Sequence, residues 1–364
     1  MRLYYDWCIF LAEGIIMMFR CVPYSESLRD EWERFVLNRG TIFHTIAFRK
    51  ILLQTFGYTC CYHAIVDTNL HICAVIPLVT GRNLGLKQVG VSLPFVNYVD
   101  ICADSEEALQ YALRSVEELQ RNSHLDYIEL RFKERDIDKP GWKKNLQHHT
   151  FVLPLVADED QILALSTASN RNHVRKVYKK DWFTVSFDAK HLQSFYHVYC
   201  TRMKQLGSPA PDIQFFERFF QYLPDNAFLL TVTDKETETV VGGMLLLTSP
   251  GNQTLYYPYG ANLIEYNHKY LNNFMYWEAV RLGIRQGMKH LDLGRSQTGS
   301  GTYKYKQQWG ATAEQLKYLV YNDGKASSGS PDKEKLHVFV ELWKRMPRFI
   351  TDQAGRLLIK YIMP

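Results

Sequence analysis

The sequence has no apolar run long enough to cross a membrane as a helix, which takes about 20 residues. Its best candidate, Cys8 to Phe19, is short, contains Glu13 and lacks the basic start and small-residue cleavage site of a signal peptide. Met17 and Met18 stand immediately before a polar stretch that opens a helix pattern. Two interpretations of residues 1–17 stay open: a start assigned too far upstream, or a poorly ordered extension ahead of the first domain.

The sequence also lacks the patterns that hold disulfides and metal ions. Its seven cysteines are an odd number, and no two of them have the C-x-x-C spacing. This argues against a disulfide framework and favours a reducing compartment. His148 and His149 are adjacent, whereas two metal ligands on one helix face stand four residues apart. We therefore expect a cytoplasmic protein with no bound metal.

Charge of one sign is not in large excess either. With 43 Lys and Arg against 38 Asp and Glu, the formal net charge is +5. A balance this even requires no nucleic-acid or membrane partner, so such a partner has to be argued from a local patch. The length of 364 residues exceeds what one hydrophobic core usually organises, and it suggests two domains.

Two halves of the sequence show the same order of expected elements. In the first half these are helices 25–37 and 45–56, strands 61–66, 72–79 and 88–98, helix 105–122 and strand 127–132. In the second half they are helices 192–206 and 213–223, strands 228–233, 240–248 and 254–260, helix 272–286 and strand 290–293. Matching elements lie about 165 residues apart, which is typical of an internal repeat.

The repeat predicts an α/β fold with a mixed sheet in each half, in the order of two tandem GNAT-like acyltransferase domains. We place the first domain at residues 18–155, with the strand-like segment 150–155 as its last strand, and the second at residues 156–325. Residues 326–364 are expected to form a Ser/Gly/Pro linker and a helical tail. The order of elements does not by itself identify the chemistry.

A motif late in the second half carries the chemical signal. Residues 272–278 read NNFMYWE, residues 291–296 read LDLGRS, and residues 299–310 read GSGTYKYKQQWG. Gly299 and Gly301 allow backbone amides to approach a ligand closely, and a lysine just beyond them can neutralise an oxyanion as a tetrahedral intermediate forms. Aminolysis of an activated ester needs little beyond placement and that charge.

These segments resemble the signature of the FemAB family, in which a helix and a strand lead into a Gly-rich loop and an aromatic-Lys-x-x-aromatic-Gly segment. The resemblance begins near Met18, is closest after Arg171, and is strongest to the FemAB-related proteins that accompany exopolysaccharide and PEP-CTERM sorting systems. It implies tandem GNAT-like domains and transfer of an amino acid from aminoacyl-tRNA to an amine on a cell-wall precursor. It also implies that Lys306 stabilises the carbonyl oxygen. The alternative is that Lys304 and Lys306 are solvated residues on one face of a strand.

Further side chains near the motif are expected to contact substrate, among them Gly299, Gly301 and Lys304. Asp292, at a strand end, either accepts the proton of the attacking amine or caps the next turn. The resemblance implies that tyrosines and basic residues in this region hold a precursor pyrophosphate. The candidates are Tyr257, Tyr259, Arg202 and Lys204. For the tyrosines, packing across the sheet is the alternative.

A basic cluster lies at residues 171–180, RNHVRKVYKK. On a helix Arg171, Arg175 and Lys179 share one face, because side chains four apart align. Such a stripe suits the phosphates of tRNA or of a nucleotide-linked acceptor. The alternative is an ordinary solvated face, although Asp181 is the one acid nearby.

The coenzyme A signature of this fold is weak. Acetyl-CoA enzymes hold the pyrophosphate on a Gly-containing turn at a helix N-terminus. Here residues 263–270 read LIEYNHKY, without glycine, and the first half offers the acidic ADSEE at residues 103–107. We therefore expect an acyltransferase without a cofactor, using aminoacyl-tRNA or a similar activated donor on a cell-wall or exopolysaccharide precursor. The alternatives are a CoA-dependent GNAT N-acyltransferase and a non-catalytic polysaccharide-assembly or RNA-binding protein.

The tail mixes apolar and basic residues, and from Lys344 onward Asp352 is its one acid. A helix with an apolar face and a cationic flank can lie in the surface of an anionic membrane, where a lipid-linked precursor would be found. This favours a location peripheral to the inner face of the membrane. The alternative is that the apolar side packs on the second domain.

Overall fold

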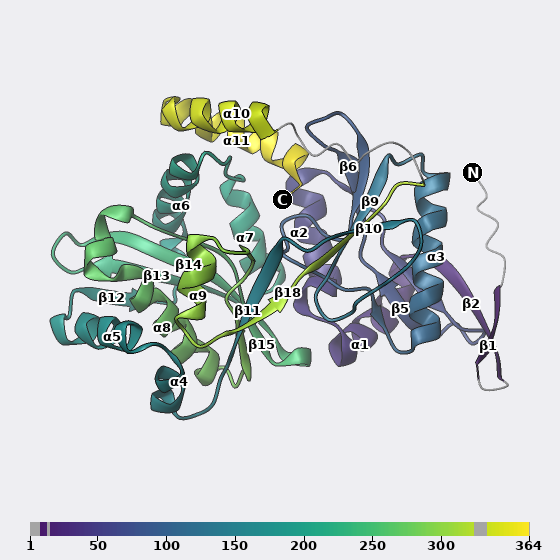
Figure 1. The fold of residues 1–364 in the computed structure, drawn as a ribbon, viewed down its shortest axis with the longest axis horizontal. Helices are drawn as coiled ribbons and strands as arrows, with labels where there is room; N and C mark the ends of the chain where they lie inside the picture. Colours follow the sequence, from purple (N-terminus) through teal and green to yellow (C-terminus); the bar gives the residue numbers. More distant parts are fainter. Residues whose placement is uncertain (1–7, 13–14, 324–332, 364) are drawn as a thin grey trace. The chain divides into compact units, whose positions relative to one another are not determined.

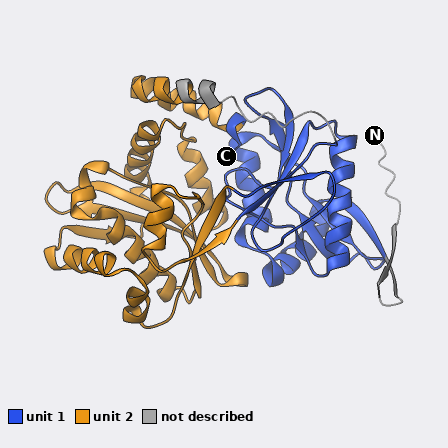
Figure 2. Cartoon of the chain, viewed as in Figure 1, with its two compact units in different colours: residues 1–146, 316–329, 361–364 blue, residues 147–315, 330–360 orange. Residues whose placement is uncertain are grey.

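The structure is a computed structural model, and it describes residues 8–12, 15–323 and 333–363. The chain divides into two compact units (Figure 2). Unit 1 comprises Met1–Leu146, Leu316–Gly329 and Tyr361–Pro364, and unit 2 comprises Gln147–Gln315 and Ser330–Lys360.

Unit 1 combines two sheets with helices. Its helices are α1 (Arg29–Arg39), α2 (Ile46–Phe56) and α3 (Glu106–Asn122), with 3-10 turns η1 (Glu26–Leu28) and η2 (Ile42–His44). One sheet contains, in spatial order, β1 (Cys8–Ala12), β2 (Ile15–Pro23), β4 (His63–Val66), β5 (Ile72–Ile76) and β8 (Cys102–Ala103). The other contains β10 (Trp142–Asn145), β19 (Lys317–Tyr321), β9 (Tyr127–Phe132), β7 (Gln88–Val91), β6 (Val79–Arg82) and β3 (Thr59–Cys60).

Local sequence signals set the helix ends of unit 1. The Thr45 side chain accepts a hydrogen bond from the Phe48 amide at the start of α2, and Gly57 ends that helix with φ +66°. Ser105 caps α3 in the same way, through the Ala108 amide. The side of α3 that faces the core is fully buried at Leu109, Ala112 and Val116, spaced three and four residues apart.

Unit 2 is built on one mixed sheet. In spatial order it contains β12 (Phe183–Ser186), β13 (Ala227–Asp234), β14 (Thr239–Ser249), β15 (Thr254–Asn262), β16 (His290–Asp292), β11 (His148–Pro154) and β17 (Ser296–Gln297), and β18 (Thr312–Gln315) pairs with β11. Its helices are α4 (Glu159–Leu165), α5 (Ala168–Lys180), α6 (Leu192–Leu206), α7 (Ile213–Tyr222), α8 (Leu271–Arg285) and α9 (Gly301–Gln307), and its 3-10 turns are η3 (Ala189–His191), η4 (Pro250–Asn252) and η5 (Ile264–Lys269).

Helices cover both faces of this sheet (Figure 1). A side chain at Gly242 of β14 would meet Met275 of α8, whereas one at Gly243 would meet Phe195 of α6. Successive residues of a strand point to opposite faces, so α8 and α6 lie on opposite sides of β14. Glycine at both positions lets the two helices approach the strand closely.

The predicted repeat and fold class are confirmed. Two helices, a hairpin and a strand, then a helix and a strand, occur in both units. α2, α3 and β9 begin at Ile46, Glu106 and Tyr127, and their counterparts α7, α8 and β16 follow about 165 residues later. Each unit is a mixed α/β domain.

The domain boundaries differ from the expected ones. Residues 150–155 were expected to form the last strand of the first domain, but most of them belong to β11, which pairs with β16 in unit 2. Conversely, β19 pairs with β9 and β10 in unit 1. An alternating pattern predicts a strand but carries no information about its partner, because pairing depends on contacts distant in sequence.

Two smaller expectations also differ. The strand expected at residues 88–98 ends at Val91, ahead of Pro94, which cannot donate a ladder hydrogen bond. Within residues 1–17, strand β1 pairs with β2, so Cys8–Ala12 belong to the first sheet. Residues 1–7 and 13–14 lie outside the described residues, and so does the proposed linker near residues 327–331.

The expected helical tail is present as α10 (Lys333–Arg345) and α11 (Arg348–Ile362). Trp343 is 1% exposed. α10 packs against α6 of unit 2. In the part of the chain that the structure describes, every helix is too short or too polar to cross a membrane.

Candidate active site

The central strands of unit 2 separate at one point. β15 and β16 run parallel and pair from Thr254 with His290 to Tyr256 with Asp292. β15 then continues to Asn262, whereas β16 ends and the chain turns at Gly294, whose φ is +79°. In open α/β sheets, ligands bind where neighbouring strands diverge at their carboxyl ends. This divergence is therefore the candidate site of unit 2.

Lys306 lies at this point, on the buried side of α9. The helix begins at a cap in which the Ser300 hydroxyl accepts a hydrogen bond from the Tyr303 amide. Lys306 is 6% exposed, and its Nζ donates to the carbonyl oxygens of Gly294 at 2.8 Å and Arg295 at 3.1 Å. The side chain thus binds the turn that follows β16.

The electrostatic setting of Lys306 is unusual for a lysine. Its pKa is lowered from 10.5 to about 8, mainly by burial. The negative charge of Asp292 opposes this shift, and the positive charge of Arg295 adds to it. The ring of Phe151 lies 5.9 Å from Nζ. A buried ammonium that titrates near neutral pH is a common feature of functional sites.

Asp292 has a clear structural task. It is 2% exposed, and its Oδ1 accepts hydrogen bonds from the Thr150 hydroxyl at 2.6 Å and the Gly294 amide at 2.7 Å. Of the two roles that the sequence leaves open, proton acceptor and turn cap, the structure shows the cap. The carboxylate fixes the turn whose carbonyls hold Lys306.

A cluster of aromatic rings connects the divergence point to α9. Tyr276 of α8 contacts Tyr257, Tyr305 and Trp309, with ring centroids 5.6, 5.3 and 5.6 Å apart. Burial raises the pKa of Tyr257, Tyr276 and Tyr305. Their hydroxyls therefore stay protonated at neutral pH and can donate hydrogen bonds.

Three buried polar atoms of this region have no hydrogen-bond partner among the described residues. They are Ser296 Oγ, Tyr305 Oη and Trp309 Nε1. The Trp309 indole interacts with the Tyr305 hydroxyl closely enough to oppose the rise that burial causes in the pKa of Tyr305, although their geometry falls short of a hydrogen bond. Most buried polar groups in native proteins are paired, so each exception needs an explanation. Ser296 directly follows Arg295, whose carbonyl holds Lys306, whereas Tyr305 lies on α9 and Trp309 just beyond its end. All three groups can donate a hydrogen bond to a polar ligand.

The other candidate residues of the motif lie outside the buried site. Lys304 is exposed, because two residues along a helix turn by about 200° and bring it to the side opposite Lys306. The alternative interpretation, in which both lysines are solvated on one face of a strand, is therefore wrong. A side chain at Gly299 or Gly301 would meet nothing within 4 Å, and what Gly299 supplies is its φ of +76°.

Gly310 and Tyr259 are packing positions. Gly310 has φ +74°, and a Cβ there would lie 2.4 Å from the Leu165 carbonyl oxygen, so the motif glycine lets α9 meet the end of α4. Tyr259 packs on the α7 rings of Phe215, Phe216 and Phe219, at 5.3 to 5.9 Å. Packing is the role that the structure shows for Tyr259.

The basic residues of α5 and α6 do not share one task. Arg171 donates to the carbonyls of Ala164 and Ser166 and so closes the end of α4 instead of extending the stripe. Arg175 and Lys179 are exposed, and Asp181 pairs with Lys235 at 2.6 Å. Arg202 and Lys204 lie in the last turns of α6, where Arg202 donates to Gln205.

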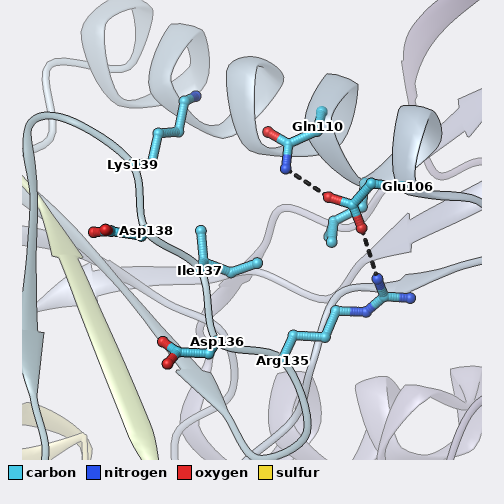
Figure 3. Close-up of a pocket in the computed structure, with 8 residues that line it drawn as sticks. Glu106, Gln110, Arg135, Asp136, Ile137, Asp138 and Lys139 are labelled. Carbon is cyan, nitrogen blue, oxygen red and sulfur yellow. Dashed lines mark hydrogen bonds and ion pairs between the residues drawn. The ribbon is translucent and has the colours of Figure 1, made fainter.

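In unit 1 the region around the start of α3 holds a pocket, but its charges are engaged. Glu106 accepts hydrogen bonds from Gln110 at 2.7 Å and Arg135 at 3.2 Å, and the loop that faces it carries Asp136 and Asp138 (Figure 3). The two basic residues of the lining are also paired, Arg135 with Glu106 and Lys139 with Glu117, and an acidic lining of this kind repels phosphate. The pocket therefore gives no support for nucleotide binding in unit 1.

Some site residues escaped the sequence analysis. Thr150 was assigned to the first domain, so its bond to Asp292 could not be foreseen. Ser296, Tyr276 and Trp309 lie inside the quoted motif segments, but nothing in the sequence separated them from packing residues. The signal that identifies them is burial without a partner, or a shared ring contact, which only the structure provides.

Comparisons with known proteins identify the type of domain and the fold. The family described as "Acetyltransferase (GNAT) domain" matches residues 165–307, which include α5, the diverging strands and Lys306. Sequence comparison with curated proteins gives no match.

Solved structures show the same fold over most of the chain. FemX has a TM-score of 0.65 at 16% identity and covers 83% of this chain and 97% of its own. L-PGS from Bacillus licheniformis has a TM-score of 0.53 at 12% identity, covering 87% and 97%. A tandem GNAT protein from the clavulanic acid biosynthesis pathway has a TM-score of 0.53 at 8% identity, covering 86% and 100%. At these identities the likeness is one of fold.

Unit 2 thus contains an acetyltransferase domain of the GNAT type, and the chain as a whole has the fold of a tandem-GNAT protein. More particularly, its fold is FemAB-like, since the FemX fold extends over 83% of the chain.

Proposed function

We propose that this acyltransferase moves an aminoacyl or acyl group from an activated ester, aminoacyl-tRNA first among the donors, to an amine on a cell-wall or exopolysaccharide precursor. The observation that carries the proposal is the position of Lys306. It is a buried ammonium held by two backbone carbonyls at the point where β15 and β16 diverge.

The hydrogen bonds of Lys306 suit it to stabilise an oxyanion. An ammonium has three donors, and the carbonyls of Gly294 and Arg295 take two of them. Among the described residues no other hydrogen bond engages Nζ, which leaves one N–H for a substrate oxygen. Because the group is fixed before the reaction, it needs no reorganisation as charge develops.

The reaction balances without a cofactor. The neutral amine of the acceptor attacks the ester carbonyl and forms a C–N bond, and the carbonyl electrons move to an oxyanion beside Lys306. The C–O bond to the donor then breaks, and the proton lost by the amine ends on the leaving hydroxyl. We assign Asp292 the role of positioning the Gly294 turn, and Ser296, Tyr305 and Trp309 the role of donating hydrogen bonds to substrate.

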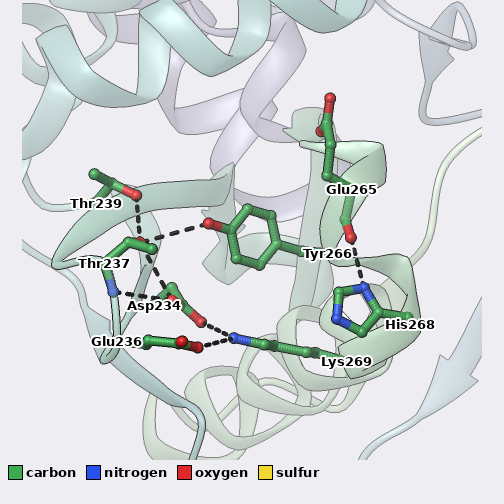
Figure 4. A network of polar contacts seen from close by, with 8 residues as sticks. All are labelled: Asp234, Glu236, Thr237, Thr239, Glu265, Tyr266, His268 and Lys269. Atoms are coloured by element: carbon green, nitrogen blue, oxygen red, sulfur yellow. Dashed lines mark hydrogen bonds and ion pairs between the residues drawn. The ribbon is translucent and has the colours of Figure 1, made fainter.

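The loop before α8 supports a donor other than coenzyme A. Lys269, its one lysine, is held by Asp234 at 2.8 Å and Glu236 at 3.2 Å (Figure 4). A pyrophosphate at this place would meet the carboxylates of Glu236 and Glu265, and the lysine of the loop itself is already paired with two carboxylates. These residues do not fit the cofactor that GNAT acetyltransferases use, and we derive no step through it. The family description nevertheless keeps a CoA-dependent N-acyltransferase as the second candidate.

The proposed partners are tRNA or a nucleotide- or lipid-linked precursor. L-PGS and FemX share the fold of this chain, and their names suggest aminoacyl transfer as a common theme. Exposed Arg175 and Lys179 offer two positive charges for phosphates. Aminoacyl-tRNA is a cytoplasmic molecule, so the proposal places the reaction in the cytoplasm.

A transfer assay with binding measurements tests the donor. Purified protein is offered mixed radiolabelled aminoacyl-tRNA with UDP-linked muropeptide, and binding of deacylated tRNA and acetyl-CoA is measured separately. We expect label on the precursor and salt-sensitive tRNA binding. Arg175→Ala combined with Lys179→Ala should weaken that binding and flatten its salt dependence, because fewer counterions are released. Micromolar acetyl-CoA binding by calorimetry, with no tRNA binding, would favour the second candidate.

A further inference from the structure

The C-terminal tail has one side fixed to unit 2. A side chain at Gly207 of α6 would lie 2.5 Å from Val340 of α10, and a side chain at Gly355 of α11 would lie 3.1 Å from the Ala210 carbonyl oxygen. Arg356 forms an ion pair with Asp212 at 3.1 Å. Thr351, Gly355 and Ile359, each four residues apart, form the buried side of α11.

The opposite side of the same helix carries exposed apolar residues, with the exposed Gln353 among them. Phe349 is 72% exposed, Leu357 69% and Ile350 39%, and Leu342 of α10 is 57% exposed. At 100° per residue, Phe349, Ile350 and Leu357 lie more than about 100° from Gly355 and so face away from unit 2. We call these four residues the outer apolar face.

Such a face requires a partner. A helix with apolar residues on two opposite sides is typically buried on both. Large exposed apolar side chains that lie together mark a site of contact with a protein or a membrane. The aromatic ring of Phe349 is the most exposed member and would enter such a partner first.

Charge favours a membrane as the partner. From Phe339 to Met363 the described tail has five basic residues, Lys344, Arg345, Arg348, Arg356 and Lys360, and two acidic ones, Glu341 and Asp352. Both acids are paired within the tail, Glu341 with Lys344 and Asp352 with Arg348. Because Arg356 is paired with Asp212 of unit 2, the tail keeps a surplus of two positive charges beside its apolar face. This surplus matches a surface of anionic lipid headgroups over apolar chains.

We propose that the outer apolar face binds the surface of an anionic bilayer, with Phe349 and Leu357 inserted among the lipid chains and Arg345 and Lys360 near the headgroups. α10 and α11 remain folded on unit 2 in this arrangement, so the tail attaches the acyltransferase domain to the membrane without spanning it. The inference does not depend on the donor or the acceptor.

Flotation with lipid vesicles tests this binding. The full-length protein is mixed with vesicles of phosphatidylcholine alone or with one third phosphatidylglycerol, and centrifuged through a density gradient. We expect flotation with the anionic vesicles and not with the neutral ones. Phe349→Ser combined with Leu357→Ser should lower the floated fraction roughly tenfold, because two inserted side chains are lost.

The matched control is Leu37→Ser combined with Leu86→Ser, which changes two leucines that are 61% and 77% exposed in unit 1. It should float like the unchanged protein, and thermal unfolding should confirm that both double variants fold. Equal flotation of the two double variants, or no flotation of any protein, would overturn the proposal. Light scattering without lipid tests the other possible partner, a second copy of this chain. If the unchanged protein is a dimer and the Phe349→Ser and Leu357→Ser variant is a monomer, the outer apolar face is a dimer interface and the membrane proposal is overturned.

Discussion

Each domain of this protein buries one cation against backbone carbonyls, and the two cations differ in how they are neutralised. In unit 1, Arg131 of β9 is 5% exposed and pairs with Glu129 at 2.8 Å, while its guanidinium also donates to the carbonyls of Leu93, Val96 and Met363. In unit 2, Lys306 donates to two carbonyls and has no ion pair in the part of the chain that the structure describes.

The pKa shifts follow this difference. Burial lowers the pKa of Arg131, but Glu129 together with Tyr318 and Tyr127 outweighs burial, and the net shift of the pKa is upward. For Lys306 burial prevails, and the pKa falls to about 8. An arginine with several engaged donors and a carboxylate is a structural element, whereas a lysine with a remaining donor and no paired carboxylate is equipped to meet a developing negative charge. Under the proposed function, the buried cation of unit 1 is structural and that of unit 2 takes part in the chemistry.

The largest expected effect is on the stability of unit 1, through Arg131. Arg131→Leu should destabilise the protein by about 3–5 kcal/mol, because it leaves the partly buried Glu129 carboxylate and three carbonyls without their partner. Urea unfolding monitored by tryptophan fluorescence measures this. Arg121→Leu is the control, since Arg121 is exposed and donates one hydrogen bond, to Tyr321. If the two variants lose the same free energy of unfolding, Arg131 has no special structural role and the contrast with Lys306 fails.

The next largest expected effect is on acyl transfer, through Lys306 of unit 2. Lys306→Met should lower kcat/KM for acyl transfer by roughly 100-fold, the usual scale for one oxyanion donor. It should also destabilise unit 2 by about 1–3 kcal/mol, because the Gly294 and Arg295 carbonyls lose their donor. From sequence alone we would expect no change in stability, since there Lys306 has no visible packing role.

Lys304→Met is the matched control for that change. Lys304 is on the same helix, two residues away and exposed, so it should keep activity within about twofold and leave unfolding unchanged. If the Lys304 variant loses as much activity as the Lys306 variant, the assignment of the oxyanion role to the buried lysine is wrong.

How much of this could be read from the sequence depends on the distance over which each signal acts. Caps such as Thr45 and Ser105 act within one helical turn, so the ends of α2 and α3 were predicted within a residue or so. The partner of β11 depends on β16, more than a hundred residues away, and was assigned to the wrong domain. Local pattern predicts elements well and pairing poorly.

The site divides in the same way. The motif placed Lys306 correctly in the chain, but the exposure of Lys304 depends on whether residues 301–307 form a helix or a strand, and the Gly-rich start suggested a loop. Arg131 lies in the alternating segment Tyr127–Phe132, where a charged residue is expected to face solvent. Only the surrounding carbonyls explain its burial, and no sequence pattern marks them.

The most direct test of the account is the pH dependence of kcat/KM for acyl transfer between pH 6 and 10, in the unchanged protein and in Lys306→Arg. If the Lys306 ammonium stabilises the oxyanion, activity should rise as the acceptor amine loses its proton and then fall as pH passes about 8, the pKa to which burial lowers Lys306. Arginine stays charged over this range, so the Lys306→Arg variant should be slower at its optimum but keep its activity above pH 8. A profile that falls near pH 8 in both proteins, or in neither, would contradict the role of Lys306 in the chemistry.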